Sequence, residues 1–363
     1  MRRHPRRPAV RHLAVTAVAV TVIAAGSASA AATPSGAAAP SAARSWQLKL
    51  AIHYLPPQTN RSQYDAVVAE SGQTWLFGGS DVFGHGRPEI ERISNGVPHA
   101  ASLPAGAHSW IAAASAVSAS DIWAVTYLGG TVLRFDGSRW AAVPRGGWRA
   151  GTRFTGITAL SPRDVWLFGT AGHRYPAAGT WHLSGSTWAR VRGVAAGIFE
   201  ASKAGPGDLW AVGNAGAPGN GLFHLRGQSW RRIKPAALAG FRYSRVLALG
   251  SRDVWVAGSV SGAPKLGHFD GRRWTLLRMP GTTVASGMCR DGRGGLWVIA
   301  NSGSSPSAVL DRSAAGTWTK AVVSRNTVNK ILACAPLAGT RRTWGAGQAS
   351  APHGTAAAAY RYG

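Results

Sequence analysis

The chain has 363 residues, and its basic side chains outnumber its acidic ones: 40 Lys+Arg against 14 Asp+Glu give a formal net charge of +26. Two cysteines argue against a zinc or redox centre, and no Gly-x-Ser-x-Gly, His-Glu-x-x-His or P-loop motif marks a catalytic site. The charge has two interpretations that the sequence leaves open: it attracts a polyanion, or it reflects an arginine-rich composition that keeps the protein in solution.

Residues 1–30 have the three parts of a secretory signal peptide. Five arginines surround the start of an apolar run over residues 13–25, and Ala28-Ser-Ala30 supplies the small residues that a signal peptidase requires. The apolar run is too short to cross a bilayer as a helix, because that takes about 20 residues. We therefore predict cleavage near Ala30, no transmembrane anchor after processing, an extracellular location, and a disordered Ala/Pro/Ser-rich linker over residues 31–42.

From residue 43 onward the dominant feature is a tryptophan that recurs every 42 to 48 residues. It stands at Trp75, Trp123, Trp166, Trp210, Trp255, Trp297 and Trp344. A repeat of this length is typical of propellers and solenoids. Each unit contains four short segments rich in β-branched and aromatic residues, joined by Gly/Asp/Ser/Pro turns, which is the pattern of a four-stranded antiparallel blade. Residues 43–363 are therefore predicted to form an all-β, seven-bladed β-propeller.

The two ends of this region predict how the ring closes. The last unit stops at Gly363 without a fourth strand. Residues 44–50, which begin Arg-Ser-Trp, match the fourth-strand segment 138–143, which begins Ser-Arg-Trp. We expect this N-terminal segment to pair with the third strand of the last unit, because an added outer strand closes the ring and removes its open edges.

The repeated phrase resembles that of secreted actinobacterial β-propellers built from Asp-Val-Trp-Ala-Val-Gly repeats, and more distantly that of Trp-Asp-repeat and kelch propellers. It is clearest as Asp164-Val-Trp-Leu-Phe-Gly, Asp208-Leu-Trp-Ala-Val-Gly and Asp253-Val-Trp-Val-Ala-Gly. The units at Trp75 and Trp344 depart most, because they lack the aspartate. The resemblance covers residues 43–363 and implies the fold without an activity, since propellers serve many functions.

Residues that recur at one repeat position are predicted to be structural. The aspartate before the tryptophan is expected to accept backbone N–H bonds in the turn between the first and second strands. His182, His224 and His268 occupy equivalent positions in separate units, whereas a metal needs ligands that converge to about 2.0–2.1 Å. We interpret these histidines as packing residues and predict no metal and no cofactor. The predicted structural set is Asp121, Trp123, Asp164, Trp166, Asp208, Trp210, Asp253 and Trp255.

The two cysteines fall on the innermost strands of neighbouring units. Cys289 lies eight residues before Trp297, and Cys334 lies ten before Trp344, across a turn that is two residues longer. In an oxidising compartment these matched positions predict a disulfide, and two buried free thiols are the alternative.

The candidate binding surface is the face that carries the longer loops, from the second strand to the third and from the fourth strand to the next unit. Aromatic rings beside arginines suit sugar rings, exposed bases or anionic polymers, through stacking and charge. The alternative is that some of these aromatic residues begin inner strands and are buried between blades. The predicted ligand-binding residues are Tyr127, Trp148, Arg149, Arg153, His173, Arg174, Tyr175, Arg242, Tyr243 and Arg245.

These patterns favour a non-catalytic, monomeric binding or scaffolding module for an extracellular glycan, cell-wall polymer or other polyanion. Specific nucleic-acid binding is not expected, and no catalytic residue is assigned. The alternative is a secreted hydrolase or lyase that acts on a polysaccharide through an acid outside the repeat, such as Glu200.

Overall fold

The structure is a computed structural model that describes residues 45–52, 61–81, 86–169, 178–192, 197–214, 220–281, 283–301, 307–323, 330–337, 340, 342–351 and 354–363. They belong to one compact unit, Gly36–Gly363. The predicted signal peptide and linker lie outside the described residues, as do His173, Arg174 and Tyr175 of the predicted binding face. The part of the chain that the structure describes has no helix long and apolar enough to cross a membrane.

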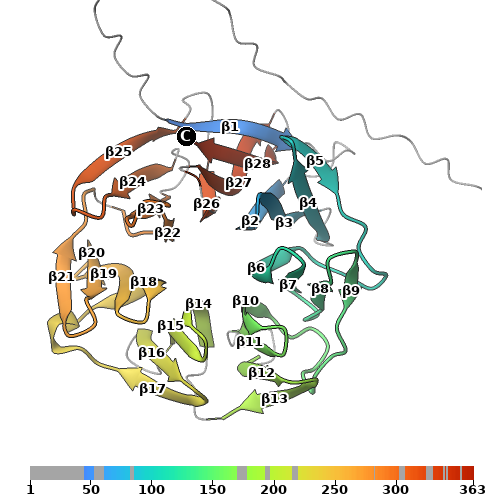
Figure 1. The fold of residues 1–363 in the computed structure, drawn as a ribbon, viewed down its shortest axis with the longest axis horizontal. Coiled ribbons are helices and arrows are strands. Elements are labelled where there is room, and N and C mark those ends of the chain that lie inside the picture. The colour runs from blue at the N-terminus through green and yellow to red at the C-terminus, as the bar shows by residue number, and fades with distance from the viewer. Residues whose placement is uncertain are drawn as a thin grey trace, which may run out of the picture. The chain divides into compact units, whose positions relative to one another are not determined.

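Seven four-stranded antiparallel blades surround a central axis, and the first strand of each blade is innermost (Figure 1). Blade 1 consists of β2 (Arg61–Glu70), β3 (Gln73–Asp81), β4 (Arg87–Ser94) and β5 (Val97–Ala100). Blade 2 consists of β6 (Ile111–Ser118), β7 (Asp121–Thr126), β8 (Val132–Phe135) and β9 (Trp140–Ala142). Blade 3 consists of β10 (Phe154–Ser161), β11 (Asp164–Gly169), β12 (Thr180–Ser184) and β13 (Thr187–Val191).

The remaining blades repeat this order. Blade 4 consists of β14 (Gly197–Gly205), β15 (Asp208–Asn214), β16 (Asn220–Arg226) and β17 (Ser229–Ile233). Blade 5 follows a short 3₁₀ helix, η1 (Ala236–Leu238), and consists of β18 (Arg242–Gly250), β19 (Asp253–Val260), β20 (Ala263–Phe269) and β21 (Trp274–Arg278). Blade 6 consists of β22 (Gly287–Arg290), β23 (Leu296–Ala300), β24 (Ala308–Arg312) and β25 (Trp318–Val323). Blade 7 consists of β26 (Lys330–Pro336), β27 (Thr343–Ala351), β28 (Gly354–Tyr362) and β1 (Ser45–Ile52).

The N-terminal strand closes the ring as predicted. β1 pairs antiparallel with β28, the third strand of the last blade, and Trp46 stands opposite Tyr362. Two short parallel pairings, β1 with β25 and β2 with β28, then join blades 6, 7 and 1 into one continuous sheet. The predicted disulfide is also present: Cys289 on β22 and Cys334 on β26 are linked, with Cα atoms 5.7 Å apart.

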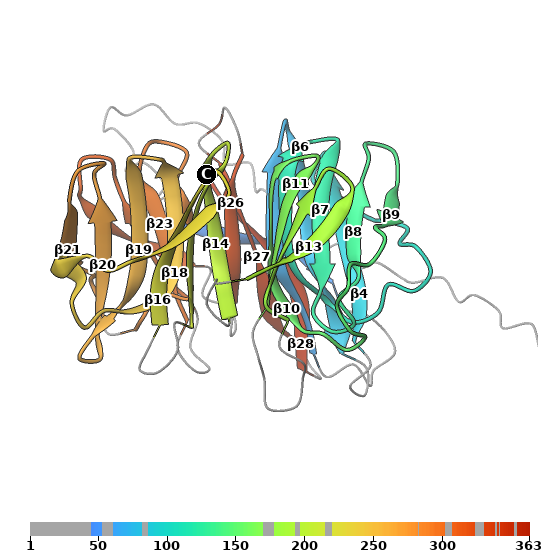
Figure 2. The same cartoon turned by 90° about the horizontal axis from the view of Figure 1, so that it is seen from below.

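Strand direction gives the propeller two different faces, which Figure 2 shows edge-on. The turns from first to second strand and from third to fourth strand meet at one face, which we call the tight-turn face. The connections from second to third strand and from fourth strand to the next blade meet at the other, which we call the long-loop face.

The tryptophan of every second strand is buried between blades, with 0–7% of its surface exposed. In blades 3 to 5 the ring stacks on a third-strand histidine, with ring centroids 3.9–4.0 Å apart. The histidine Nε2 in turn lies 2.8–2.9 Å from Oδ1 of the repeat aspartate. In blade 2, Arg134 takes the place of the histidine, 2.8 Å from Asp121 and over the Trp123 ring. The repeat residues therefore form one structural unit of acid, indole and cation or imidazole in each of these blades.

One detail of the predicted aspartate role is wrong. These carboxylates accept hydrogen bonds from side chains rather than from turn N–H groups: Asp164 accepts from Trp166 Nε1 at 2.9 Å, and Asp253 accepts from Trp255 Nε1 at 2.8 Å. The reason is the pleat, which directs the aspartate and the tryptophan two residues later to the same side of the strand. In blades 3 and 5 the carboxylate therefore reaches the indole N–H, whereas in blades 2 and 4 it bonds to the third-strand side chain, Arg134 or His224.

Candidate functional site

Two aromatic residues of the predicted binding face are buried. Trp148 is 6% exposed, its Nε1 donates to Gly130 O at 3.1 Å, and its ring packs edge-on against Trp181 at 5.2 Å. Tyr243 is 7% exposed. The expectation that both rings lie open to a ligand is wrong, because both pack between blades: Tyr243 lies at the start of the inner strand β18, and Trp148 lies in the loop between β9 and β10. Their burial between blades agrees with the alternative given in the sequence analysis, in which some of these aromatic residues are part of the packed interior.

Four other predicted residues lie in three different places: Tyr127 and Arg153 stack on each other, Arg149 lies in an exposed loop, and Arg245 lines the central channel. Tyr127 is half-buried and stacks on Trp110, with centroids 4.6 Å apart, and the Arg153 guanidinium lies 4.2 Å from the Tyr127 ring centroid. Arg149 is exposed in the loop between blades 2 and 3. Arg245, in contrast, lines the central channel, where its Nε donates to Ser286 O at 2.6 Å. The described residues therefore do not form one continuous face.

A groove of about 770 Å³ opens on the long-loop face between blades 4 and 5. Three exposed cationic residues line it: Arg232 on β17, Lys234 just after β17, and Arg242 at the start of β18. Apolar and aromatic residues line it as well, among them the buried Phe241 and Tyr243, whose ring centroids lie 4.8 Å apart. No carboxylate occurs among the described residues that line this groove. We call it the basic groove.

The basic groove is held by local backbone contacts. η1 and the turn after it are closed by hydrogen bonds from Leu238 N to Pro235 O at 3.0 Å and from Phe241 N to Leu238 O at 3.1 Å. Asn220 Nδ2 donates to Tyr243 O at 2.8 Å and so connects β16 to β18. Burial raises the pKa of the Tyr243 phenol to about 12, with Arg232 opposing the shift. The phenol is therefore neutral at physiological pH, and the groove keeps its positive charge.

The central channel contains a second polar feature. On the second strand of each blade, the residue two positions after the repeat tryptophan pairs with a residue of the first strand. In five blades this first-strand residue is alanine or glycine: Ala66, Ala113, Gly156, Gly287 and Ala333. Blades 4 and 5 have Glu200 and Arg245 there instead. The two side chains line a cavity of about 310 Å³, with Arg245 Nε 3.9 Å from Glu200 Oε1. This departure from the repeat became apparent only from the strand register.

Glu200 is held by the neighbouring blade. Its Oε2 accepts a hydrogen bond from Val246 N at 2.8 Å. Burial raises the pKa of the Glu200 carboxyl, while Arg245 and the Val246 N–H oppose the rise. The pair therefore connects blades 4, 5 and, through Ser286 O, 6 across the channel wall.

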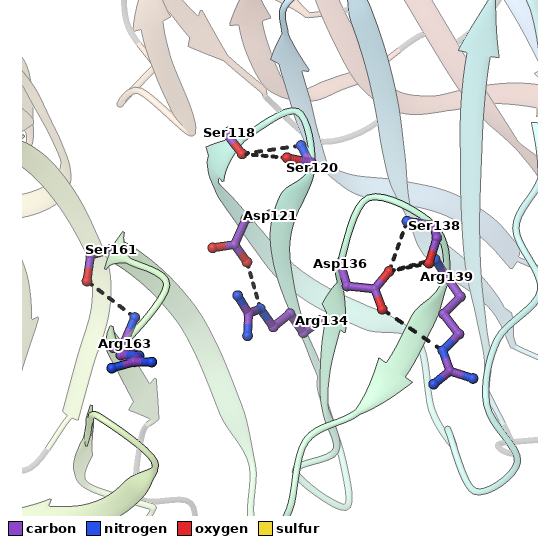
Figure 3. A network of polar contacts seen from close by, with 9 residues as sticks. All are labelled: Ser118, Ser120, Asp121, Arg134, Asp136, Ser138, Arg139, Ser161 and Arg163. Carbon is purple, nitrogen blue, oxygen red and sulfur yellow. Dashed lines mark hydrogen bonds and ion pairs between the residues drawn. The ribbon is translucent and has the colours of Figure 1, made fainter.

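At the tight-turn face of blade 2, the carboxylates bond to groups of the same blade (Figure 3). Asp136 accepts from Ser138 N, Ser138 Oγ and Arg139 N at 2.7–2.9 Å, and these bonds lower its pKa to about 2. Asp121 is paired with Arg134. These carboxylates stabilise their turns and strands. Within the described residues, no group of three His, Cys, Asp or Glu side chains is arranged to hold a metal ion.

The comparisons with known proteins support the fold. No family model and no curated relative matches the chain. Among solved structures, YCF48 bound to D1 peptide has a TM-score of 0.60 at 14% identity, over 86% of this chain and 98% of that one. A catalytically inactive virginiamycin B lyase from Staphylococcus aureus, with quinupristin, has a TM-score of 0.62 at 10% identity, over 87% and 99%. Puromycin hydrolase has a TM-score of 0.58 at 13% identity, over 87% and 54%.

Proposed function

We propose that this protein is a non-catalytic, secreted binding module whose ligand is an anionic polymer held in the basic groove. The observation that carries the proposal is the convergence of Arg232, Lys234 and Arg242 on one concavity whose described lining residues include no carboxylate. Cationic side chains in a concave, partly apolar site concentrate anions and bind phosphate or carboxylate groups.

The distribution of acids supports this proposal. Of the chain's 14 Asp and Glu residues, those of the repeat and the hairpin turns are engaged internally, as in the pairs Asp121–Arg134 and Asp164–His182. Internal pairing leaves the groove cations without a neutralising carboxylate among the described lining residues. A polymer with repeated phosphate or carboxylate groups, such as an anionic cell-wall polymer, would supply this neutralising negative charge.

The predicted export of the chain supports an extracellular ligand. The disulfide between Cys289 and Cys334 belongs to an oxidising compartment. The fold itself does not choose between functions, because propellers of similar architecture include both YCF48 bound to D1 peptide and puromycin hydrolase.

The alternative enzyme hypothesis rests on Glu200. A carboxyl with a raised pKa suits general acid catalysis, but this one is bonded to Val246 N and lies beside Arg245. These contacts support a role for Glu200 in joining blades. Hydrolysis of a polysaccharide that is abolished by Glu200→Gln would place the protein among the enzymes instead.

The test compares two matched triple variants for binding to teichoic acid and to polyglutamate. Arg232→Gln, Lys234→Gln and Arg242→Gln together remove three groove charges. Arg139→Gln, Arg163→Gln and Arg273→Gln remove three exposed charges on the tight-turn face. We expect the groove variant to lose about 3- to 150-fold in affinity, at roughly 0.2–1 kcal/mol for each exposed charge pair, and the control variant to bind nearly as wild type. Equal losses in both variants would overturn the proposal.

A further inference from the structure

A second pocket lies at the mouth of the central channel on the tight-turn face. Its volume is about 670 Å³, and its lining residues come from blades 6, 7 and 1, with Ala116 added from blade 2. We call it the mouth pocket. It lies on the face opposite the basic groove, and none of its lining residues takes part in that groove.

The three blades that build the mouth pocket are those in which the structural repeat is altered. Two residues before the repeat tryptophan, blades 2 to 5 have aspartate, whereas blades 1, 6 and 7 have Gln73, Gly295 and Arg342. Blade 6 also has Asp311 where blades 3 to 5 have histidine, opposite Trp297 in the strand register. Blades 6, 7 and 1 are consecutive around the ring, so the altered turns lie side by side.

One side of the mouth pocket carries a positioned cation. Arg290, at the end of β22 in blade 6, is exposed, and its Nη2 donates to Ala248 O at 3.1 Å and to Leu249 O at 2.7 Å. A guanidinium has five N–H donors, so these two bonds fix its position and leave donors for a ligand. The nearby Arg293 lies 3.9 Å from Asp311, which balances its charge.

The blade 1 side of the mouth pocket carries an acid. Glu70 ends β2, and burial raises the pKa of its carboxyl, with the attraction of Lys203 in blade 4 opposing the rise. Blade 7 lies between blades 6 and 1 and contributes apolar wall, namely Ala335, Pro336 and Leu337. The mouth pocket thus has an acid from one blade, a guanidinium from another, and apolar residues from the blade between them.

We infer that the mouth pocket binds a short zwitterionic peptide with apolar side chains. Its ammonium group would bind Glu70, its carboxylate would bind Arg290, and its side chains would cover the wall of blade 7. The volume lies within the range of about 300–1,000 Å³ that small-ligand sites occupy. A polyanion suits this pocket less well than the basic groove, because the Glu70 carboxylate would repel it.

The test uses the tripeptide Leu-Ala-Leu, its N-acetyl form and its C-terminal amide, each titrated calorimetrically against the mature protein. Each modification removes one terminal charge, and we expect each to weaken binding about tenfold or more. Equal affinity of the three peptides, or no binding of the unmodified peptide at millimolar concentration, would overturn the inference.

Protein variants assign each terminus to its partner. Glu70→Gln should abolish the discrimination against the N-acetyl peptide and keep that against the amide, and Arg290→Gln should do the reverse. Arg290→Lys keeps the positive charge and should therefore restore discrimination against the amide in part. It also serves as a control for misfolding caused by the loss of the Ala248 and Leu249 contacts in Arg290→Gln. Arg278→Gln, on the exposed outer strand β21, is the matched control and should leave all three affinities unchanged. Discrimination that persists unaltered in both Glu70→Gln and Arg290→Gln would contradict the assignment.

Discussion

Blades 2 to 5 differ from blades 6, 7 and 1 in the contacts that hold each blade in place. In blades 2 to 5 an aspartate, a buried tryptophan and a third-strand histidine or arginine form a unit within each blade, as Asp164, Trp166 and His182 do. In blades 6, 7 and 1 that unit is incomplete, and the pairings of β1 with β25 and β28 and of β2 with β28, together with a disulfide, connect the blades instead. Local side-chain bonds are thus the distinctive contacts of blades 2 to 5, and long-range connections those of blades 6, 7 and 1, and this difference predicts where substitutions cost most.

The largest effect is expected from breaking the closure. Trp46 on β1 is fully buried and packs on Trp297 at 5.4 Å and on Tyr362 at 5.8 Å. Trp46→Ala should lower the free energy of unfolding by about 3–5 kcal/mol, and deletion of residues 45–52 should cause aggregation, because the edge of β28 is then exposed. Thermal unfolding and light scattering measure both. Removal of residues 31–42 is the control, and an equal loss of stability there would contradict this account of closure.

The disulfide should come next. Cys289 and Cys334 close a loop of 45 residues, and such a crosslink stabilises by about 4 kcal/mol through the entropy of the unfolded chain. The double variant Cys289→Ala, Cys334→Ala should lose stability of this order in denaturant unfolding, whereas reducing agent should have no effect on that variant. A variant as stable as the oxidised wild type would show that strand pairing alone holds blades 6 and 7.

A smaller effect is expected inside one consensus blade. Asp164→Ala removes the acceptor of both Trp166 Nε1 and His182 Nε2, and leaving these donors unsatisfied should cost about 1–3 kcal/mol. Asp164→Asn keeps one acceptor oxygen and should lose less. At the corresponding position of blade 1, Gln73→Ala should change stability by less than about 0.5 kcal/mol. Equal costs at Asp164 and Gln73 would erase the distinction between the two regions.

The smallest effect concerns pH. Hydrogen bonds in its turn lower the pKa of the exposed Asp136 from 3.8 to about 2. A carboxyl with a depressed folded-state pKa contributes stability that is present above the unfolded pKa and is lost as pH falls through the folded pKa. We therefore expect the Asp136 carboxyl to titrate near pH 2 by NMR, and Asp136→Asn to flatten the acid side of the stability curve slightly. Titration of Asp136 near pH 4 would show that the turn bonds do not persist in solution.

The repeat tryptophans explain why so much of the fold was predictable. Trp123, Trp166, Trp210 and Trp255 mark equivalent buried positions, so their spacing determines the number of blades and the position of each strand. The register of Cys289 and Cys334 follows from the same spacing. The sequence of residues 44–50 resembles that of a fourth strand, and this similarity likewise predicted how the ring closes.

The binding surface was less predictable, because it depends on how loops pack rather than on a period. Trp148 is buried by the fold of its own loop, and nothing in its local sequence distinguishes it from an exposed aromatic residue. Arg232 and Lys234 come together with Arg242 only through the turn of η1. The basic residues that directly follow Trp230 in the chain were, however, a usable sign of a positively charged surface. Glu200 and Arg245 lie close together because blades 4 and 5 are adjacent, but their equivalent positions on the inner strands are visible only in the strand register.

Hydrogen–deuterium exchange in the presence of teichoic acid would show whether an anionic polymer lies in the basic groove, because it maps the contact surface on the wild-type protein. We expect slower exchange in residues 229–246, which contain the cations of the basic groove, and unchanged exchange in the tight turn at residues 136–140. Protection spread evenly over exposed arginine-containing segments on both faces, and lost together at about 1 M salt as screening shortens to about 3 Å, would contradict this expectation.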